Sequence, residues 1–275
     1  GICMHLKKLV RLASAALFIL SVCACTNSDS SKNNGEQLPE LIIACDIYEP
    51  YTFFDDEGNF SGIDVELADE ACRRIGYKAK FEQIKWEEKE KLLLAGDIDC
   101  IWSCFSMDDR EDKYSWIGPY MYSAQSVVVR ATGDIKSLGD LEGKKFAVQT
   151  STKTEEFLLK RPYDTIPNAD KIYSFSEIGE TFGALSKGYV DACAGHDEAM
   201  RNFIKDSPGS YRIIDELLAQ SRLGIAFRKD ENREFLETLA NALADMRNEG
   251  IIAQIAEKYN VSAENAAEVS VIGGK

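Results

Sequence analysis

The chain has 275 residues, of which 45% are hydrophobic, and its formal net charge is -14 at pH 7. This length is sufficient for one large domain or for two lobes that each bury a core, and the composition favours a globular α/β protein. Nucleic-acid affinity depends on Lys and Arg side chains that neutralise phosphates, so the negative charge excludes a nucleic-acid partner. We expect the acidity to serve solubility.

The amino-terminal segment predicts export. Basic residues between Lys7 and Arg11 precede an uncharged run of 13 residues, 12–24. This order is typical of a secretory signal, and the run is too short for an ordinary bilayer span. We therefore expect residues 1–24 to form a signal peptide.

The end of this run, Val22-Cys23-Ala24-Cys25, resembles a bacterial lipobox, in which the cysteine after a small residue is lipidated. We expect Cys25 to carry the lipid and the polar segment 25–38 to be a flexible tether. The protein would then be extracytoplasmic and anchored to the cell membrane. The alternative is an ordinary signal that is cleaved after Ala24 and leaves no lipid.

Cysteine and histidine usage argues against several kinds of site. Without residues 1–24, His196 is the only histidine, which weighs against histidine-based nucleophilic catalysis or a histidine-rich metal site. We expect neither a metal nor another cofactor. The remaining cysteines form no CxxC pair, and the pattern favours buried reduced thiols over a disulfide. They are Cys45, Cys72, Cys100, Cys104 and Cys193.

In chain order, the first elements predict a parallel sheet built from strand–helix units. We expect strands at 41–47, 78–84 and 97–105, and helices at 63–75 and 86–96. Ligands of such sheets bind beyond the carboxyl ends of the strands. The loops after Cys45 and Ser103 are therefore the first places to look for a site.

A second strand–helix series begins near residue 123 and continues to about residue 221. A strand at 223–230 and two amphipathic helices, near 232–248 and 251–258, complete the predicted elements. The two series share the alternation of strands and helices and show no repeated sequence. The expected fold class is α/β.

Six sequence blocks resemble, in order, those of bacterial extracellular solute-binding proteins of the polar amino-acid class, which serve ABC importers. The resemblance covers about 41–259. The blocks are "YEPYTFFDDEGNFSGIDVELADEACRRIG", "LLLAGDIDC" after a tryptophan, "SCFSMDDRE" followed by "WIGPYMYS", "LEGKKFAVQTST", "LSKGYVDACAGHDE" and "GIAFRK".

This resemblance implies a type II periplasmic-binding fold. Two lobes, each a mostly parallel sheet flanked by helices, would enclose a ligand cleft. The chain would cross between lobes, so that 39–122 and 222–275 form the first lobe and 123–221 form the second. It also implies a monomeric binding protein, not an enzyme, that delivers an amino acid to an ABC permease.

For the ligand carboxylate, the resemblance points to Arg110, whose guanidinium can grip both oxygens. Ser106 and backbone amides after Cys104 would complete this cradle. From the second lobe, Thr152 at a helix start would add donors, and Lys153 would add a cation or point away. The alternatives are a solvated Arg110 and an ordinary helix cap at Thr152.

For the ligand ammonium, the resemblance points to Asp197, with the carbonyl of Ser103 as a further acceptor. A helix-capping role is the alternative for Asp197. Aromatic cover from Tyr48 and Trp86 is implied in the same way, and Trp102 either joins them or belongs to the core. Asp46 favours a cationic or polar ligand side chain, or is a solvated loop acid.

The sequence departs from the common pattern at the carboxylate cradle. The interval from Gly96 to Arg110 is about one residue shorter, Cys104 replaces glycine or serine, Ser151 replaces glycine, and Lys153 replaces serine or threonine. These changes leave the ligand class open. Two other functions also remain open. One is a cyclohexadienyl-dehydratase-like enzyme on the same fold, and the other is a sensory module for a membrane signalling partner. The enzyme would need an acid or base such as Glu49, Asp108 or Glu198.

Overall fold

The computed structural model describes residues 37–273. The predicted signal peptide, the predicted lipidation site Cys25 and nearly all of the predicted tether therefore lie outside the described residues. Within residues 37–273, no helix combines the length and the apolar character that crossing a bilayer requires. The described residues also contain no group of three or more His, Cys, Asp or Glu side chains placed to hold a metal ion.

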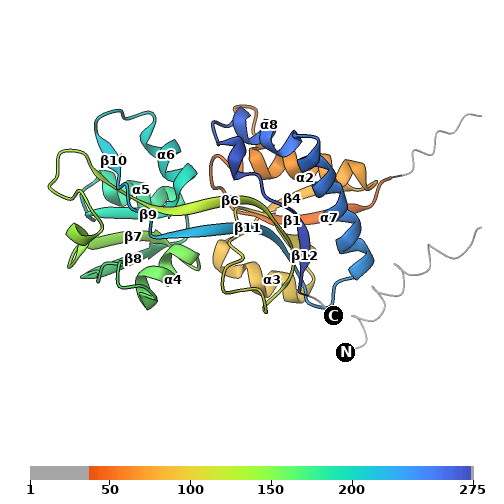
Figure 1. Ribbon diagram of the computed structural model, residues 1–275, viewed down its shortest axis with the longest axis horizontal. Helices are drawn as coiled ribbons and strands as arrows, with labels where there is room; N and C mark the ends of the chain where they lie inside the picture. The colour runs from red at the N-terminus through yellow and green to blue at the C-terminus, as the bar shows by residue number, and fades with distance from the viewer. Residues whose placement is uncertain (1–36, 274–275) are drawn as a thin grey trace, which may run out of the picture. The chain divides into compact units, whose positions relative to one another are not determined.

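Ten of the described strands form one sheet, with the path β4-β1-β5-β11-β6-β9-β7-β8 and with β10 and β12 paired to β6 (Figure 1). Their bounds are β1 Glu40–Cys45, β4 Lys78–Gln83, β5 Cys100–Ile101, β6 Ser115–Arg130, β7 Lys145–Gln149, β8 Lys171–Phe175, β9 Ala192–His196, β10 Tyr211–Ile213, β11 Ala219–Phe227 and β12 Ser270–Ile272. A separate short pair consists of β2 Phe53–Phe54 and β3 Phe60–Ser61.

The sheet is parallel toward its two ends and antiparallel in between. β1 pairs in parallel with β4 and β5, and we call these three strands the first section. β7 pairs in parallel with β8 and β9, and these three strands are the second section. β6 and β11 join the sections as a long antiparallel pair. The predicted α/β class, with two mostly parallel groups of strands, is confirmed.

Helices follow the strands as the sequence pattern predicts. They are α2 Ile63–Arg74, α3 Lys89–Ala95, α4 Lys153–Lys160, α5 Ile178–Ser186, α6 Asp197–Ile204, α7 Arg233–Asn248 and α8 Ile251–Lys258, with 3-10 turns η1 Trp86–Glu88, η2 Gly139–Leu141 and η3 Ala263–Asn265. α2 illustrates the cause: its apolar residues recur at helical spacing and are buried, while acids occupy its first turn and arginines its last. α7 begins after Asn232, whose side chain accepts from the N–H groups of Glu234 and Phe235.

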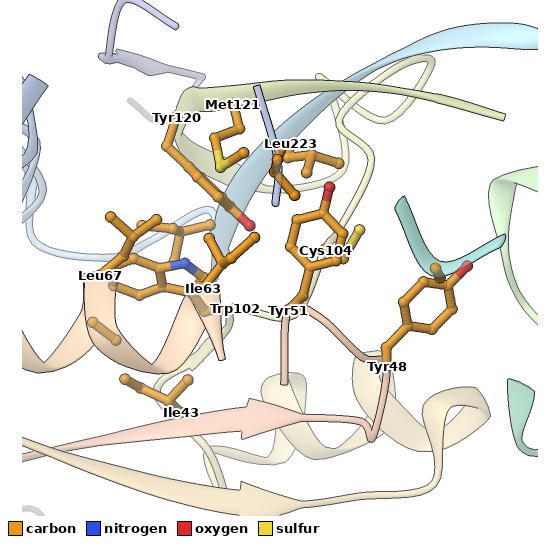
Figure 2. Packing of buried hydrophobic residues seen from close by; sticks show 14 of the residues in the cluster. Ile43, Tyr48, Tyr51, Ile63, Leu67, Trp102, Cys104, Tyr120, Met121 and Leu223 are labelled. Atoms are coloured by element: carbon orange, nitrogen blue, oxygen red, sulfur yellow. The ribbon is translucent and has the colours of Figure 1, made fainter. Parts of the chain in front are cut away.

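The largest buried cluster contains residues of both sections, from Ile43 and Leu67 to Cys193 and Met200. In Figure 2, Tyr48 and Tyr51 extend from the chain after β1 on the side of this core where Cys104 lies. All five cysteines of the described residues are buried and free. The core thus reaches the carboxyl ends of the first-section strands.

Candidate functional site

A small pocket lies at the carboxyl ends of strands from both sections. It is formed by the segments after β1, β5 and β7, by η1 after β4, and by the end of β9. Its lining residues are Asp46, Tyr48, Trp86, Ser103, Cys104, Phe105, Ser106, Arg110, Gln149, Ser151, Thr152, Lys153 and His196. The predicted position beyond the strand ends is therefore occupied by a pocket.

One side of the pocket is rich in cations. The Nη1 of Arg110 donates to the carbonyl of Ser106 at 3.0 Å, and its guanidinium lies 5.2 Å from the ring centroid of Phe105. Burial lowers the pKa of Arg110, which nevertheless remains a cation at neutral pH. Its Nη2 lies 3.7 Å from Glu156. The guanidinium therefore has donors left for a ligand anion.

Lys153 brings a second cation to this side. Its side chain is almost fully buried, and its Nζ lies 2.6 Å from Asp109 and 3.3 Å from Glu156. The neighbouring Thr152 caps α4, because its Oγ1 accepts from the N–H of Glu155 at 3.2 Å. That hydroxyl also donates to the carbonyl of Gln149 at 2.7 Å. The capping role predicted for Thr152 is thus present at the pocket wall.

Asp46 provides the negative charge of the pocket lining. Its side chain accepts a hydrogen bond from the Nε2 of Gln149, and only 5% of the residue is exposed. Burial raises the pKa of Asp46 to about 6, the hydrogen bond from Gln149 opposes this rise, and the nearby carboxylates of Glu177 and Glu87 add to it. Within residues 37–273, no Lys or Arg forms an ion pair with Asp46.

Several contacts connect the two sections across the pocket. The N–H of His196 donates to the hydroxyl of Tyr48 at 2.9 Å. The Nζ of Lys89 donates to the carbonyl of Ser151 at 3.1 Å. The hydrogen bond from Gln149 to Asp46 makes a third connection. These contacts bridge the two sections across the pocket.

His196 is buried at the inner wall of the pocket. Its Nδ1 lies 3.1 Å from the hydroxyl of Ser123, and its Nε2 lies 3.5 Å from that of Ser106. Burial lowers the pKa of His196 to about 3, so the ring is neutral at physiological pH. A neutral imidazole with polar partners on both nitrogens orients its neighbours and adds no charge to the site.

The chemistry that this lining favours is non-covalent recognition of a small ion with two charges. Arg110 and Lys153 offer charge-assisted donors at one wall, and Asp46 offers an acceptor from another segment. Apolar cover comes from Tyr48 and Trp86. A zwitterion such as an amino acid matches this distribution of charge.

The model of the bacterial extracellular solute-binding proteins, family 3, matches residues 41–262. The chain belongs to this family. Its relatives include the histidine-binding periplasmic protein of Salmonella typhimurium, which is 30% identical over 77% of this chain and 84% of the relative. The L-cystine-binding protein TcyJ of Escherichia coli is 26% identical over 77% of this chain and 79% of the relative.

Solved structures of amino-acid-binding proteins share the fold. An ancestral arginine-binding protein bound to arginine matches with a TM-score of 0.73 and 29% identity, over 80% of this chain and 98% of that chain. The ancestral amino acid-binding protein AncCDT-1, a precursor of cyclohexadienyl dehydratase, matches with a TM-score of 0.72 and 27% identity, over 80% and 95%. The expected type II periplasmic-binding fold of this solute-binding protein is thereby confirmed.

The structure of this family member brings most of the predicted site residues together. The pocket is lined by Asp46, Tyr48, Trp86, Ser103, Cys104, Ser106, Arg110, Thr152 and Lys153. These residues come from separate segments of the chain. Their convergence on one pocket is an observation, and their contact with a ligand stays a prediction.

Two predicted residues lie elsewhere. Trp102 is 1% exposed and packs in the core, with its ring centroid 6.0 Å from that of Tyr120. Asp197 begins α6, where its carboxylate accepts from the hydroxyl of Ser126 and from the Nε of Arg201, each at 2.6 Å. In this structure, Asp197 does not line the pocket.

Sequence reasoning did not include four lining residues: Phe105, Gln149, Ser151 and His196. Gln149 and His196 are the last residues of β7 and β9. Their position at the carboxyl end of parallel strands was the available signal. Phe105 and Ser151 adjoin residues that the sequence did indicate.

Proposed function

We propose that this solute-binding protein captures an amino acid in the pocket by closure of two lobes and delivers it to an ABC permease. The observation that carries the proposal is the meeting of Arg110 with Thr152 and Lys153, from opposite sections, at one wall of the pocket. Such a wall binds a carboxylate only when both sections surround it. Binding and closure are then one event.

The carboxylate of the ligand lies against Arg110 in this proposal. Its guanidinium stacks on Phe105 and is tied to the Ser106 carbonyl, so its direction is set before the ligand arrives. The backbone amides at the start of α4 supply further donors. The hydroxyl of Ser106 donates to that of Ser221 at 3.2 Å, so it would serve the ligand only after turning away from Ser221. Preorganised donors in a buried site make this wall selective for an anion.

The cationic part of the ligand lies toward Asp46. This carboxylate has no basic partner within the described residues and is held by the neutral amide of Gln149. A ligand ammonium or cationic side chain would supply the missing positive charge. Asp197 can serve the α-ammonium only after a rotation that releases Ser126 and Arg201.

The same proposal includes the location and organisation of the protein. Cys25 carries a lipid, 25–38 is a tether, and the body works as a monomer on the extracytoplasmic face of the membrane. Segments 39–122 and 222–275 form one lobe, and 123–221 form the other. The long β6–β11 pair supports this division, because it is the connection through which both sections are hydrogen-bonded.

A thermal-shift screen of the twenty amino acids and L-cystine, followed by calorimetry, tests the ligand class. We expect at least one L-amino acid with a cationic or polar side chain to raise the Tm and to bind with about micromolar affinity, which corresponds to about -8 kcal/mol. The D-enantiomer is the matched control, since its charges are the same. No shift with any L-amino acid would contradict the proposal.

The dehydratase-like alternative requires an acid or base in the pocket. Of the acids considered for it, Glu49 is exposed and lies 3.6 Å from Lys205, and Asp108 binds Arg222 at 2.7 Å. Glu198 does not line the pocket either, because its carboxylate accepts from the hydroxyl of Ser123 at 2.6 Å and from the side-chain amide of Asn265 at 3.2 Å. Among the described residues, Asp46 is the acid that lines the pocket, so an enzyme would have to use it. Incubation with a prephenate-like cyclic acid, followed by mass spectrometry, distinguishes the functions. Loss of water from that acid would establish the enzyme.

A further inference from the structure

Asp64 lies behind the pocket and connects three segments of the chain. It is the second residue of α2 and is 1% exposed. Its N–H donates to the carbonyl of Tyr51 at 2.9 Å, in the loop that also carries Tyr48. Its Oδ2 accepts from the N–H of Cys104, and its Oδ1 accepts from the hydroxyl of Tyr120, both at 2.7 Å.

The close approach of α2 to the Tyr51 loop depends on Gly62. At this residue φ is +121°, and an added Cβ would lie 2.4 Å from the carbonyl oxygen of Tyr51. A side chain there would displace the start of α2 and with it Asp64. The local sequence therefore places the carboxylate at a fixed position beneath the pocket.

Cys104 is the pocket residue that this carboxylate holds. Its backbone is in the left-handed conformation, with φ of +46°, which residues other than glycine rarely adopt. Its N–H is buried and requires an acceptor. The Oδ2 of Asp64 accepts a short hydrogen bond from this N–H at 2.7 Å.

We propose that Asp64 is a positioning residue of the binding site. Its carboxylate holds Cys104 in the left-handed conformation and thereby sets the path of residues 103–106, which form one wall of the pocket. Tyr120 fixes the other carboxylate oxygen and keeps Asp64 in that orientation. The inference rests on the proposed function only in that a ligand contacts this wall.

Hydrogen exchange of the ligand-free protein tests the geometry directly. In Asp64→Ala, we expect the amides of 103–107 to exchange about tenfold to a hundredfold faster, because the buried N–H of Cys104 loses its acceptor. Asp64→Asn keeps an oxygen for the Cys104 N–H and turns its NH₂ group toward the Tyr120 hydroxyl, so exchange should remain within about threefold of wild type. Asp69→Ala, on the exposed side of the same helix, is the control.

A rescue separates positioning from general destabilisation. Glycine adopts positive φ without strain, so Cys104→Gly in the Asp64→Ala background should restore the path of the loop. We expect affinity for L-arginine, L-histidine or L-cystine, measured by calorimetry, to fall at least about tenfold in Asp64→Ala and to recover in the double variant. Should Asp64→Ala not fold, recovery of folding in the double variant supports the proposal and continued failure overturns it.

Two results would overturn the proposal. One is loop exchange in Asp64→Ala equal to that of wild type. The other is faster exchange across the whole fold without rescue by Cys104→Gly, which would mean that Asp64 serves the core alone. If the wild-type protein binds none of the three amino acids, the proposed function loses support, whereas the exchange result still decides the role of Asp64.

Discussion

The backbone N–H of His196, at the end of β9, donates to the hydroxyl of Tyr48, which follows β1, at 2.9 Å. The two rings meet edge to face, with centroids 5.8 Å apart. This pair connects the second section of the sheet to the first without any ligand. Gly195 makes the contact possible, since an added Cβ would lie 2.6 Å from the Tyr48 hydroxyl and 2.8 Å from the Cε of Met200.

Gly195→Ala should therefore separate Tyr48 from His196. We expect the affinity for the amino-acid ligand to fall about tenfold and the free energy of unfolding to fall by about 1–3 kcal/mol, because the new methyl group overpacks the pocket wall. Calorimetry and urea unfolding measure the two effects. Gly183→Ala is the control, because its Cβ meets no atom within 4 Å. Equal affinity in Gly195→Ala and Gly183→Ala would contradict this role of the pair.

Ligand affinity should depend on pH through Asp46. Its pKa is raised to about 6, so the carboxylate that faces the cationic part of the ligand becomes neutral as the pH falls below 6. We expect calorimetry with L-arginine to show weaker binding at pH 5 than at pH 7.5 in wild type, and no such change in Asp46→Asn. A parallel pH dependence in both proteins would exclude Asp46 as the cause.

The stability of the ligand-free protein should respond to Asp46 in the opposite direction. The pKa is about 6 in the folded protein and 3.8 as the ordinary value, so between these pH values the folded state holds a proton that the unfolded state has released. The free energy of unfolding then falls as the pH rises from 4 to 6, by at most about 3 kcal/mol. Urea unfolding at pH 4.5 and pH 7, with Asp46→Asn as reference, measures it. A rise over this range would contradict the prediction.

Lys89 is a buried cation whose replacement should increase stability. Its Nζ lies 4.6 Å from the Trp86 ring and donates to the carbonyls of Trp86 and Ser151, and it forms no ion pair within residues 37–273. Burial lowers its pKa to about 8. Lys89→Met should leave the free energy of unfolding at pH 7 equal or higher, since it removes a buried charge.

The pH dependence of this difference has a definite sign. Between pH 8 and pH 10.5 the unfolded chain keeps the Lys89 proton that the folded protein has lost, so wild-type stability rises with pH relative to Lys89→Met. Urea unfolding of both proteins at pH 7 and pH 9.5 measures the change. Lys91→Met, on the exposed side of α3, is the control. If wild-type stability does not rise relative to that of Lys89→Met between pH 7 and pH 9.5, the assignment is contradicted.

The sequence predicted the fold well where periodicity was regular. The two final helices, expected near 232–248 and 251–258, are observed as α7 and α8 at almost the same residues. β6 was less predictable: a strand was expected only from residue 123, but it begins at Ser115. Pro119 lies inside β6, where a proline is normally unfavourable because it has no N–H to donate. It is accommodated because the β6–β11 pairing is irregular between Leu223 and Ile225 of β11.

The site was predictable to the extent that motifs mark the ends of strands. Arg110 and Thr152 lie in the pocket as their motifs indicate, because parallel strands bring their carboxyl ends to one edge. The position of Asp197 was not determined by its motif, since Ser126 and Arg201 compete for its carboxylate. The role inferred for Asp64 depends on a contact with Cys104, 40 residues away in the chain, that no local pattern reveals.

Calorimetry of wild type and Arg110→Ala with the amino acid selected by the thermal-shift screen tests the central claim most directly. Removal of the guanidinium takes away charge-assisted hydrogen bonds to the ligand carboxylate, so we expect the Kd to rise at least about tenfold, and by a hundredfold or more if both oxygens are held. Arg73→Ala, on the exposed surface of α2, should bind as wild type does. Equal affinities of Arg110→Ala and wild type would contradict the claim that this pocket binds an amino acid through Arg110.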